Sequence, residues 1–103
     1  MTKEEEKNIT SLVLRADTLH AIMNVCYENY MQAKKVAEEE EDKIRGGFYD
    51  IDYIGSYNYF KNRRHEFYVQ AERDYFNAVE DYKRAINDIY NKEINQCKPH
   101  GQF

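Results

Sequence analysis

The sequence predicts an all-α fold: two long antiparallel helices that form a helical hairpin, joined by an aromatic loop. Apolar residues recur at alternating steps of three and four through both halves of the chain, which is the helical repeat. The four glycines and the one proline stand in the middle of the chain and near its C-terminal end, so two long stretches are uninterrupted. At 103 residues, the chain is expected to form a single domain.

The first helix is expected over residues 3–45. Its apolar positions step by three and four in turn, which is the pattern of a helix that packs along partner helices. This seam consists of Ile9, Leu12, Ala16, Leu19, Met23, Cys26, Tyr30, Ala33 and Ala37. Glycine adopts left-handed backbone at little cost, so the pair Gly46-Gly47 predicts the end of the helix.

Residues 46–56 break the helical period, and we interpret them as the connecting loop. Three apolar residues alternate there with Asp50 and Asp52, which is compatible with a short strand or an extended segment. The alternating residues are Tyr49, Ile51 and Tyr53.

The second helix is expected over residues 57–97, with Ser56 as its N-cap. Pro99 and Gly101 end the helical pattern, so the tail 98–103 is expected to fray. The predicted inner face of this helix consists of Phe60, Phe67, Ala71, Tyr75, Ala78, Tyr82, Ala85 and Ile89.

The apolar stripes of both helices are wider than a two-stranded contact needs. Each helix of roughly 40 residues would be about 60 Å long, and a lone hairpin buries one stripe of each. We therefore expect a homodimer that forms a four-helix bundle. The alternative is a break that folds one long segment back on itself.

Charge patterning also favours an antiparallel hairpin. A turn at residues 50–51 would set the acidic run Glu38–Asp42 opposite residues 59–63, beside the basic cluster Lys61, Arg63 and Arg64. The acidic run lies near the C-terminus of its helix and the basic cluster near the N-terminus of the other, so each charge is unfavourable for the dipole of its own helix. The two runs have opposite charges and would attract each other. We expect these charges to fix the orientation of the two helices.

No enzyme, metal site or cofactor is expected. The chain lacks GxSxG, P-loop, GxGxxG and HExxH motifs. Asp17-x-x-His20 is a single copy of a motif that di-iron bundles need twice. Cys97-x-x-His100 would need Cys26 and His20 as further zinc ligands. The predicted hairpin would place Cys97 roughly 33 Å from Cys26, which is too far for a shared metal ion.

The net charge and the cysteines indicate which class of partner and which cellular compartment to expect. The formal net charge is −4, and neither half of the chain is strongly basic, which disfavours nucleic acid as the partner. No apolar run would serve as a signal peptide or a membrane span, and two unpaired cysteines suit a reducing compartment. We therefore expect a cytoplasmic protein that binds no membrane.

The predicted partner-binding residues lie in and next to the loop: Phe48, Tyr49, Asp50, Asp52, Tyr53, Tyr57 and Tyr59. Tyrosine is favoured in binding hot spots because it is large, rigid and amphipathic. The alternative role for this segment is a hydrophobic cap over the end of the bundle. A second alternative is nucleic-acid contact by Lys61, Arg63 and Arg64, whose neighbouring tyrosines would stack on bases.

The expected function is non-enzymatic protein–protein interaction. A small, acidic, aromatic-rich helical chain of this kind resembles the accessory proteins of phages and mobile elements that inhibit or redirect a host or defence protein, as anti-CRISPR and anti-restriction inhibitors do. In length and hairpin form it also resembles the secreted WXG100 family. It departs from that family by having Gly46-Gly47-Phe48 in place of the Trp-x-Gly turn. Tyr68-x-x-x-Glu72 resembles the tail signal of the family, but it lies in the middle of the expected second helix instead of after the bundle.

Overall fold

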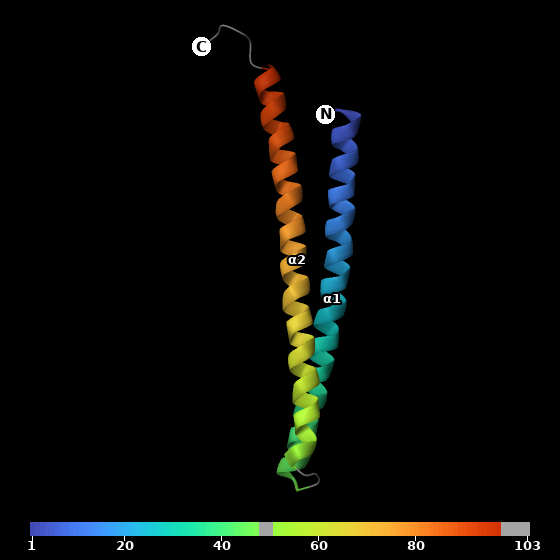
Figure 1. Cartoon of the computed structure of the whole chain (residues 1–103), viewed down its shortest axis with the longest axis vertical. Helices are drawn as coiled ribbons and strands as arrows, with labels where there is room; N and C mark the ends of the chain where they lie inside the picture. The colour runs from blue at the N-terminus through green and yellow to red at the C-terminus, as the bar shows by residue number, and fades with distance from the viewer. Residues whose placement is uncertain (48–50, 98–103) are drawn as a thin grey trace.

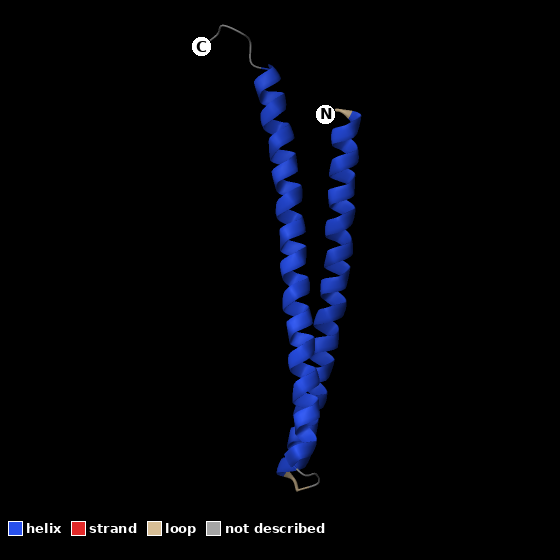
Figure 2. Ribbon diagram, in the orientation of Figure 1, coloured by secondary structure: helices blue, strands red, loops and turns tan. Residues whose placement is uncertain are grey.

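The computed structural model of the chain is an antiparallel helical hairpin, which confirms the predicted fold class. Helix α1 spans Lys3–Arg45 and helix α2 spans Ile51–Cys97. Figure 1 shows that α2 ends beside the start of α1, and Figure 2 shows that both elements are helical throughout. The structure describes residues 1–47 and 51–97, with backbone alone for residues 51–54 and 97.

The first turn of α1 is closed by a capping box. The Thr2 hydroxyl accepts a hydrogen bond from the Glu5 backbone N–H at 3.1 Å, and the Glu5 carboxylate accepts one from the Thr2 N–H at 2.9 Å. These two bonds satisfy backbone donors that have no partner inside the helix. The signal for them, Thr-x-x-Glu at positions 2–5, is present in the sequence.

The connection between the helices is shorter than the predicted loop of residues 46–56. Gly46 and Gly47 donate their backbone N–H groups to Asp42 and Ile44, and Gly47 has a φ of +82°, so α1 ends at the predicted glycines. Helix α2 begins at Ile51 instead of near residue 57, which corrects the loop boundary. The alternation at 49–53 misled because Ile51, Ile54 and Tyr57 also follow a helical step of three.

The register of the hairpin follows from three ring contacts between the helices. His20 lies 4.9 Å from Tyr75, Tyr27 lies 5.2 Å from Tyr68, and Tyr30 lies 4.8 Å from His65, measured between ring centroids. The two residue numbers add to 95 in each pair. The register between the helices is therefore centred about three residues earlier than the turn at residues 50–51 that the sequence predicted.

Burial confirms the predicted seam of α1. Ala33 and Ala37 are buried, and the other seam positions are half-buried. In α2 the buried residues are Ala71 and Ala78, flanked by half-buried tyrosines at positions 68, 75 and 82. The four alanines allow the helix backbones to approach closely, and the tyrosine rings fill the space between them.

The predicted inner face of α2 is wrong at its first two positions. Phe60 and Phe67 are 55% and 53% exposed, and Tyr68 occupies the seam instead. In the sequence, Ala71 follows Phe67 by a helical step of four and Tyr68 by a helical step of three, so either residue could precede it in the seam. Contact of Tyr68 with Tyr27 and Tyr30 selects the second pattern.

The hairpin is one helix layer thick, with principal extents of 83 × 27 × 14 Å. Its fully buried apolar side chains, among the described residues, are four alanines, and none of the large side chains described is fully buried. Within the described residues, neither helix has a stretch apolar enough to cross a membrane. Much apolar surface of both helices therefore faces outward in the single chain.

Candidate functional site

A hollow of about 300 Å³ lies between the helices close to the turn. Helix α1 contributes Ala33 and Val36 to its lining, and α2 contributes Tyr57, Phe60 and Arg64, with Gln32 at its edge. Ala33 makes the hollow possible because its methyl group leaves room that a larger seam residue would fill. The result is an apolar recess with one guanidinium at its rim.

Further exposed aromatic side chains lie on α2 near this recess. Tyr59 is 60% exposed and meets the Phe60 ring edge-on at 5.7 Å, and Phe67 lies two turns further along α2. The Arg63 guanidinium sits 5.0 Å from the centre of the Phe67 ring, which is a cation–π distance. We call Val36, Tyr57, Tyr59, Phe60, Arg64 and Phe67 the turn-end patch.

Two of the seven predicted partner-binding residues, Tyr57 and Tyr59, belong to the turn-end patch. Phe48, Tyr49 and Asp50 lie outside the described residues. Asp52 and Tyr53 stand in the first turn of α2, where the structure describes the backbone alone. The patch thus adjoins the predicted segment and extends along α2 to residues that the sequence placed in the core.

Phe60 and Phe67 are the patch residues that sequence reasoning missed. Both fit the apolar repeat of α2, so periodicity alone assigned them to the inner face. A signal against that assignment was available, because Tyr68 directly follows Phe67 and continues to Ala71 and Tyr75 by helical steps of three and four. Two overlapping apolar rows on one helix indicate one row for the hairpin contact and a second for another surface.

The basic cluster is largely engaged within α2 and across to α1. Arg63 forms an ion pair with Glu66 at 3.1 Å, in addition to its contact with Phe67. Arg64 donates a hydrogen bond of 3.4 Å to the Asn29 carbonyl oxygen. Lys61 is half-buried in the seam. Arg63 and Arg64 thus make contacts inside the chain while both remain exposed, and nucleic-acid contact by the cluster stays a prediction.

The predicted pairing of acidic and basic runs is wrong. Glu40 and Glu41 pair with Lys43 and Arg45 of their own helix, at 3.0 and 2.9 Å. The earlier turn moves the acidic run opposite residues near 53–57, away from Arg63 and Arg64. Pairs within a helix at spacings of three and four thus replace the expected pairs between helices.

Tyr68 and Glu72 are also engaged with each other. The Tyr68 hydroxyl donates a hydrogen bond of 2.9 Å to Glu72 Oε2, and this bond is the main reason that the pKa of Tyr68 is raised. The Tyr-x-x-x-Glu spacing therefore has a structural explanation inside α2. It puts an acceptor one helical turn from a seam tyrosine.

Of the residues considered as metal ligands, Asp17, His20 and Cys26 lie in α1, whereas the Cys97 side chain and His100 lie outside the described residues. Among the described residues, no three His, Cys, Asp or Glu side chains gather as metal ligands do. His20 instead packs on Tyr75 and lies 3.4 Å from the Asn24 amide nitrogen. Cys26 is half-buried in the seam of α1.

Comparison with known proteins gives the chain no relatives: no protein-family model, curated protein or solved structure matches it.

Proposed function

We propose that this chain is a non-enzymatic protein–protein interaction module that binds its partner at the turn end of the hairpin. The observation that carries the proposal is the turn-end patch, in which the exposed Phe60 ring lines an apolar recess and the exposed rings of Tyr59 and Phe67 lie along the same helix. Leaving such rings in water is unfavourable, and aromatic residues with an arginine dominate binding energy at protein interfaces.

The recess indicates the chemistry of the partner segment. Val36, Tyr57 and Phe60 would contact an apolar side chain, and Arg64 at the rim would pair with a carboxylate next to it. We therefore expect a segment in which a large apolar residue neighbours Asp or Glu. The resemblance to phage and mobile-element accessory proteins supports a role in which this contact inhibits or redirects a host or defence protein.

The test is capture of a partner from lysate of a plausible host, followed by binding measurements on the purified pair. Isothermal titration calorimetry of Phe60→Ala should show affinity lower by at least about tenfold, since a central aromatic contact contributes about 2 kcal/mol. Arg64→Glu should weaken binding further by placing like charges together. Circular dichroism would check that both variants keep the helical content of the parent chain.

Leu14→Ala is the control. Leu14 is 61% exposed, as strongly as Phe60, and lies in α1 outside the turn-end patch. Equal loss in the two variants would contradict a site at the turn end. Binding of DNA or RNA that falls steeply with salt, with no protein captured, would favour the nucleic-acid alternative instead.

A further inference from the structure

The flank of α2 opposite the turn-end patch carries a second apolar row. Val69, Phe76, Ile86 and Tyr90 are between 36% and 60% exposed there, although they follow the helical repeat. With the residues between them they form a continuous row at steps of three and four. We call this row the lateral strip: His65, Val69, Glu72, Phe76, Val79, Lys83, Ile86 and Tyr90.

The lateral strip is self-complementary when it is read against itself in the opposite direction. About its midpoint, between Asn77 and Ala78, Phe76 corresponds to Val79, and Val69 corresponds to Ile86. The only acid corresponds to the only lysine, Glu72 to Lys83. The ends correspond as two aromatic rings, His65 to Tyr90. Every position thus meets a residue of matching chemistry.

We infer that a second copy of this chain docks on the lateral strip, with the two α2 helices antiparallel about a two-fold axis at Asn77 and Ala78. The axis brings Phe76 of each copy against Val79 of the other and forms two Glu72–Lys83 ion pairs. The arrangement is isologous, as in most dimers, because one surface supplies both sides of the contact. It goes beyond the proposed function, since it uses the opposite flank of the helix.

The side chains of the strip are positioned for these pairs. The Tyr68 hydroxyl holds Glu72 through a hydrogen bond of 2.9 Å to Oε2. The Lys83 ammonium makes only a distant ion pair within its chain, 3.7 Å from Glu80, and both side chains are about two-thirds exposed. A pair this exposed contributes little, so Lys83 is readily redirected to Glu72 of the second copy.

Helix α1 broadens the docking surface. Val13, Tyr27 and Met31 are 37–45% exposed and adjoin the strip, on the flank where Tyr27 meets Tyr68. The strip from His65 to Tyr90 is about 38 Å long, and two helices side by side are about 20 Å wide. The face then covers roughly 800 Å² per copy, which is the usual size of a stable interface.

The other flank does not suit a second copy. Asp74, Asp81 and Asp88 follow one another there at steps of seven, so a two-fold contact would bring like charges together. Asp81 is the member that pairs across the hairpin, with Arg15 at 3.7 Å. Charge therefore separates the flank that accepts a second copy from the one that repels it.

A charge-swap experiment tests the antiparallel pairing. Sedimentation equilibrium of the full chain should show a dimer, and the dissociation constant should rise by at least about tenfold in Lys83→Glu and in Glu72→Lys. In a homodimer of either variant both ion pairs become like-charge pairs. In an equimolar mixture of the two variants both pairs are restored, so the mixture should dimerise as the parent chain does.

Arg84→Glu is the control, since it makes the same charge change one residue along, about 100° around the helix axis and outside the lateral strip, and should leave the dimer intact. Thermal melts of the variants followed by circular dichroism would verify that helicity is retained. A parent chain that remains monomeric would overturn the inference. So would single variants that dimerise normally, or a mixture that fails to recover the dimer.

Discussion

The two flanks of α2 carry similar numbers of exposed aromatic and aliphatic residues, yet their charges differ in kind. The turn-end patch has arginines at its edge and acidic residues further along the same flank. The lateral strip has one acid and one base, placed symmetrically about its midpoint. A surface with an unbalanced charge needs a different molecule as its partner, whereas a balanced, symmetric surface is complementary to itself.

This difference would allow a chain with so small a core to gain stability from a second copy. Four buried alanines and a seam of half-buried side chains remove little apolar surface from water, whereas a second copy on the lateral strip would cover four more exposed apolar side chains of α2. The turn-end patch would stay open in that dimer. One flank would then complete the fold, and the other would remain available for the partner.

The substitution expected to have the largest effect is Phe76→Glu. It removes two rings from the centre of the dimer and adds two unpaired charges, so the dissociation constant should rise by at least about 100-fold. The melting temperature should fall with it and should lose its dependence on concentration. Sedimentation equilibrium and thermal melts at two concentrations measure both effects.

Phe60→Glu is the matched change on the other flank. It should leave self-association unchanged, because Phe60 belongs to the turn-end patch and not to the lateral strip. Dissociation of the dimer by Phe60→Glu, with Phe76→Glu behaving as the parent chain, would reverse the roles assigned to the two flanks.

A smaller effect on stability is expected from substitution of the glycines near the turn. These substitutions test whether α2 already includes the residues just before the turn-end patch. Gly55 lies within α2, and a methyl group built there meets no atom within 4 Å. Gly55→Ala should therefore stabilise the protein by about 0.5–1 kcal/mol, because glycine weakens a helix interior. Chemical denaturation monitored by circular dichroism measures the change.

Gly47→Ala should instead destabilise the protein. The backbone of Gly47 has a φ of +82°, which an alanine adopts only at a cost of about 1 kcal/mol or more. Loss of stability in both variants would indicate that residues near 55 form a loop, as the sequence suggested. The patch residues Tyr57 and Tyr59 would then no longer be oriented by α2.

The sequence predicted the hairpin because its signals are local and strong. The seam of α1 repeats without interruption from Ile9 to Ala37, and the pair Gly46-Gly47 marks the end of the helix. The start of α2 was harder, since Ile51 and Tyr53 fit an extended pattern as well as a helical one. Three alternating residues are too few to separate the two periods.

The candidate site was only partly predictable, because it depends on the register between the helices. A shift of about three residues in the turn separated Glu38–Asp42 from Arg63 and Arg64. The choice between Phe67 and Tyr68 as the seam residue rested on rings of α1 that no repeat within α2 reveals. The composition identified aromatic surface, and packing between the helices decided which rings form it.

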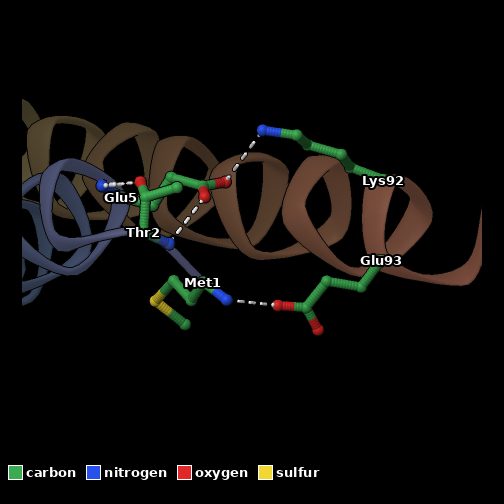
Figure 3. A network of polar contacts seen from close by, with 5 residues as sticks. All are labelled: Met1, Thr2, Glu5, Lys92 and Glu93. Atoms are coloured by element: carbon green, nitrogen blue, oxygen red, sulfur yellow. Dashed lines mark hydrogen bonds and ion pairs between the residues drawn. The ribbon is translucent and has the colours of Figure 1, made fainter. Parts of the chain in front are cut away.

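The smallest effect is expected at the open end of the hairpin, where exposed polar contacts hold the helices together beside the end of the lateral strip. Figure 3 shows the network: the Met1 amino group contacts Glu93 at 2.9 Å, and the Lys92 ammonium lies 4.0 Å from Glu5. The Glu93 hydrogen bond and charge raise the pKa of the Met1 amino group above its ordinary value of 8.0.

Because the pKa of this amino group is raised in the folded state, its contribution is complete below about pH 8 and disappears as the pH rises through the raised value. Glu93→Gln should therefore melt slightly below the parent chain at pH 7, and the gap should close as the pH rises above 8. Glu5 provides the reverse case. Its pKa is lowered, chiefly by the hydrogen bond from the Thr2 backbone, so its contribution is lost as the pH falls below 4.5. A gap for Glu93→Gln that persists at pH 10 would show that the amino group does not join the two helices. The ion pair of Lys92 with Glu5 would then be the described polar contact that still joins α1 and α2 at this end.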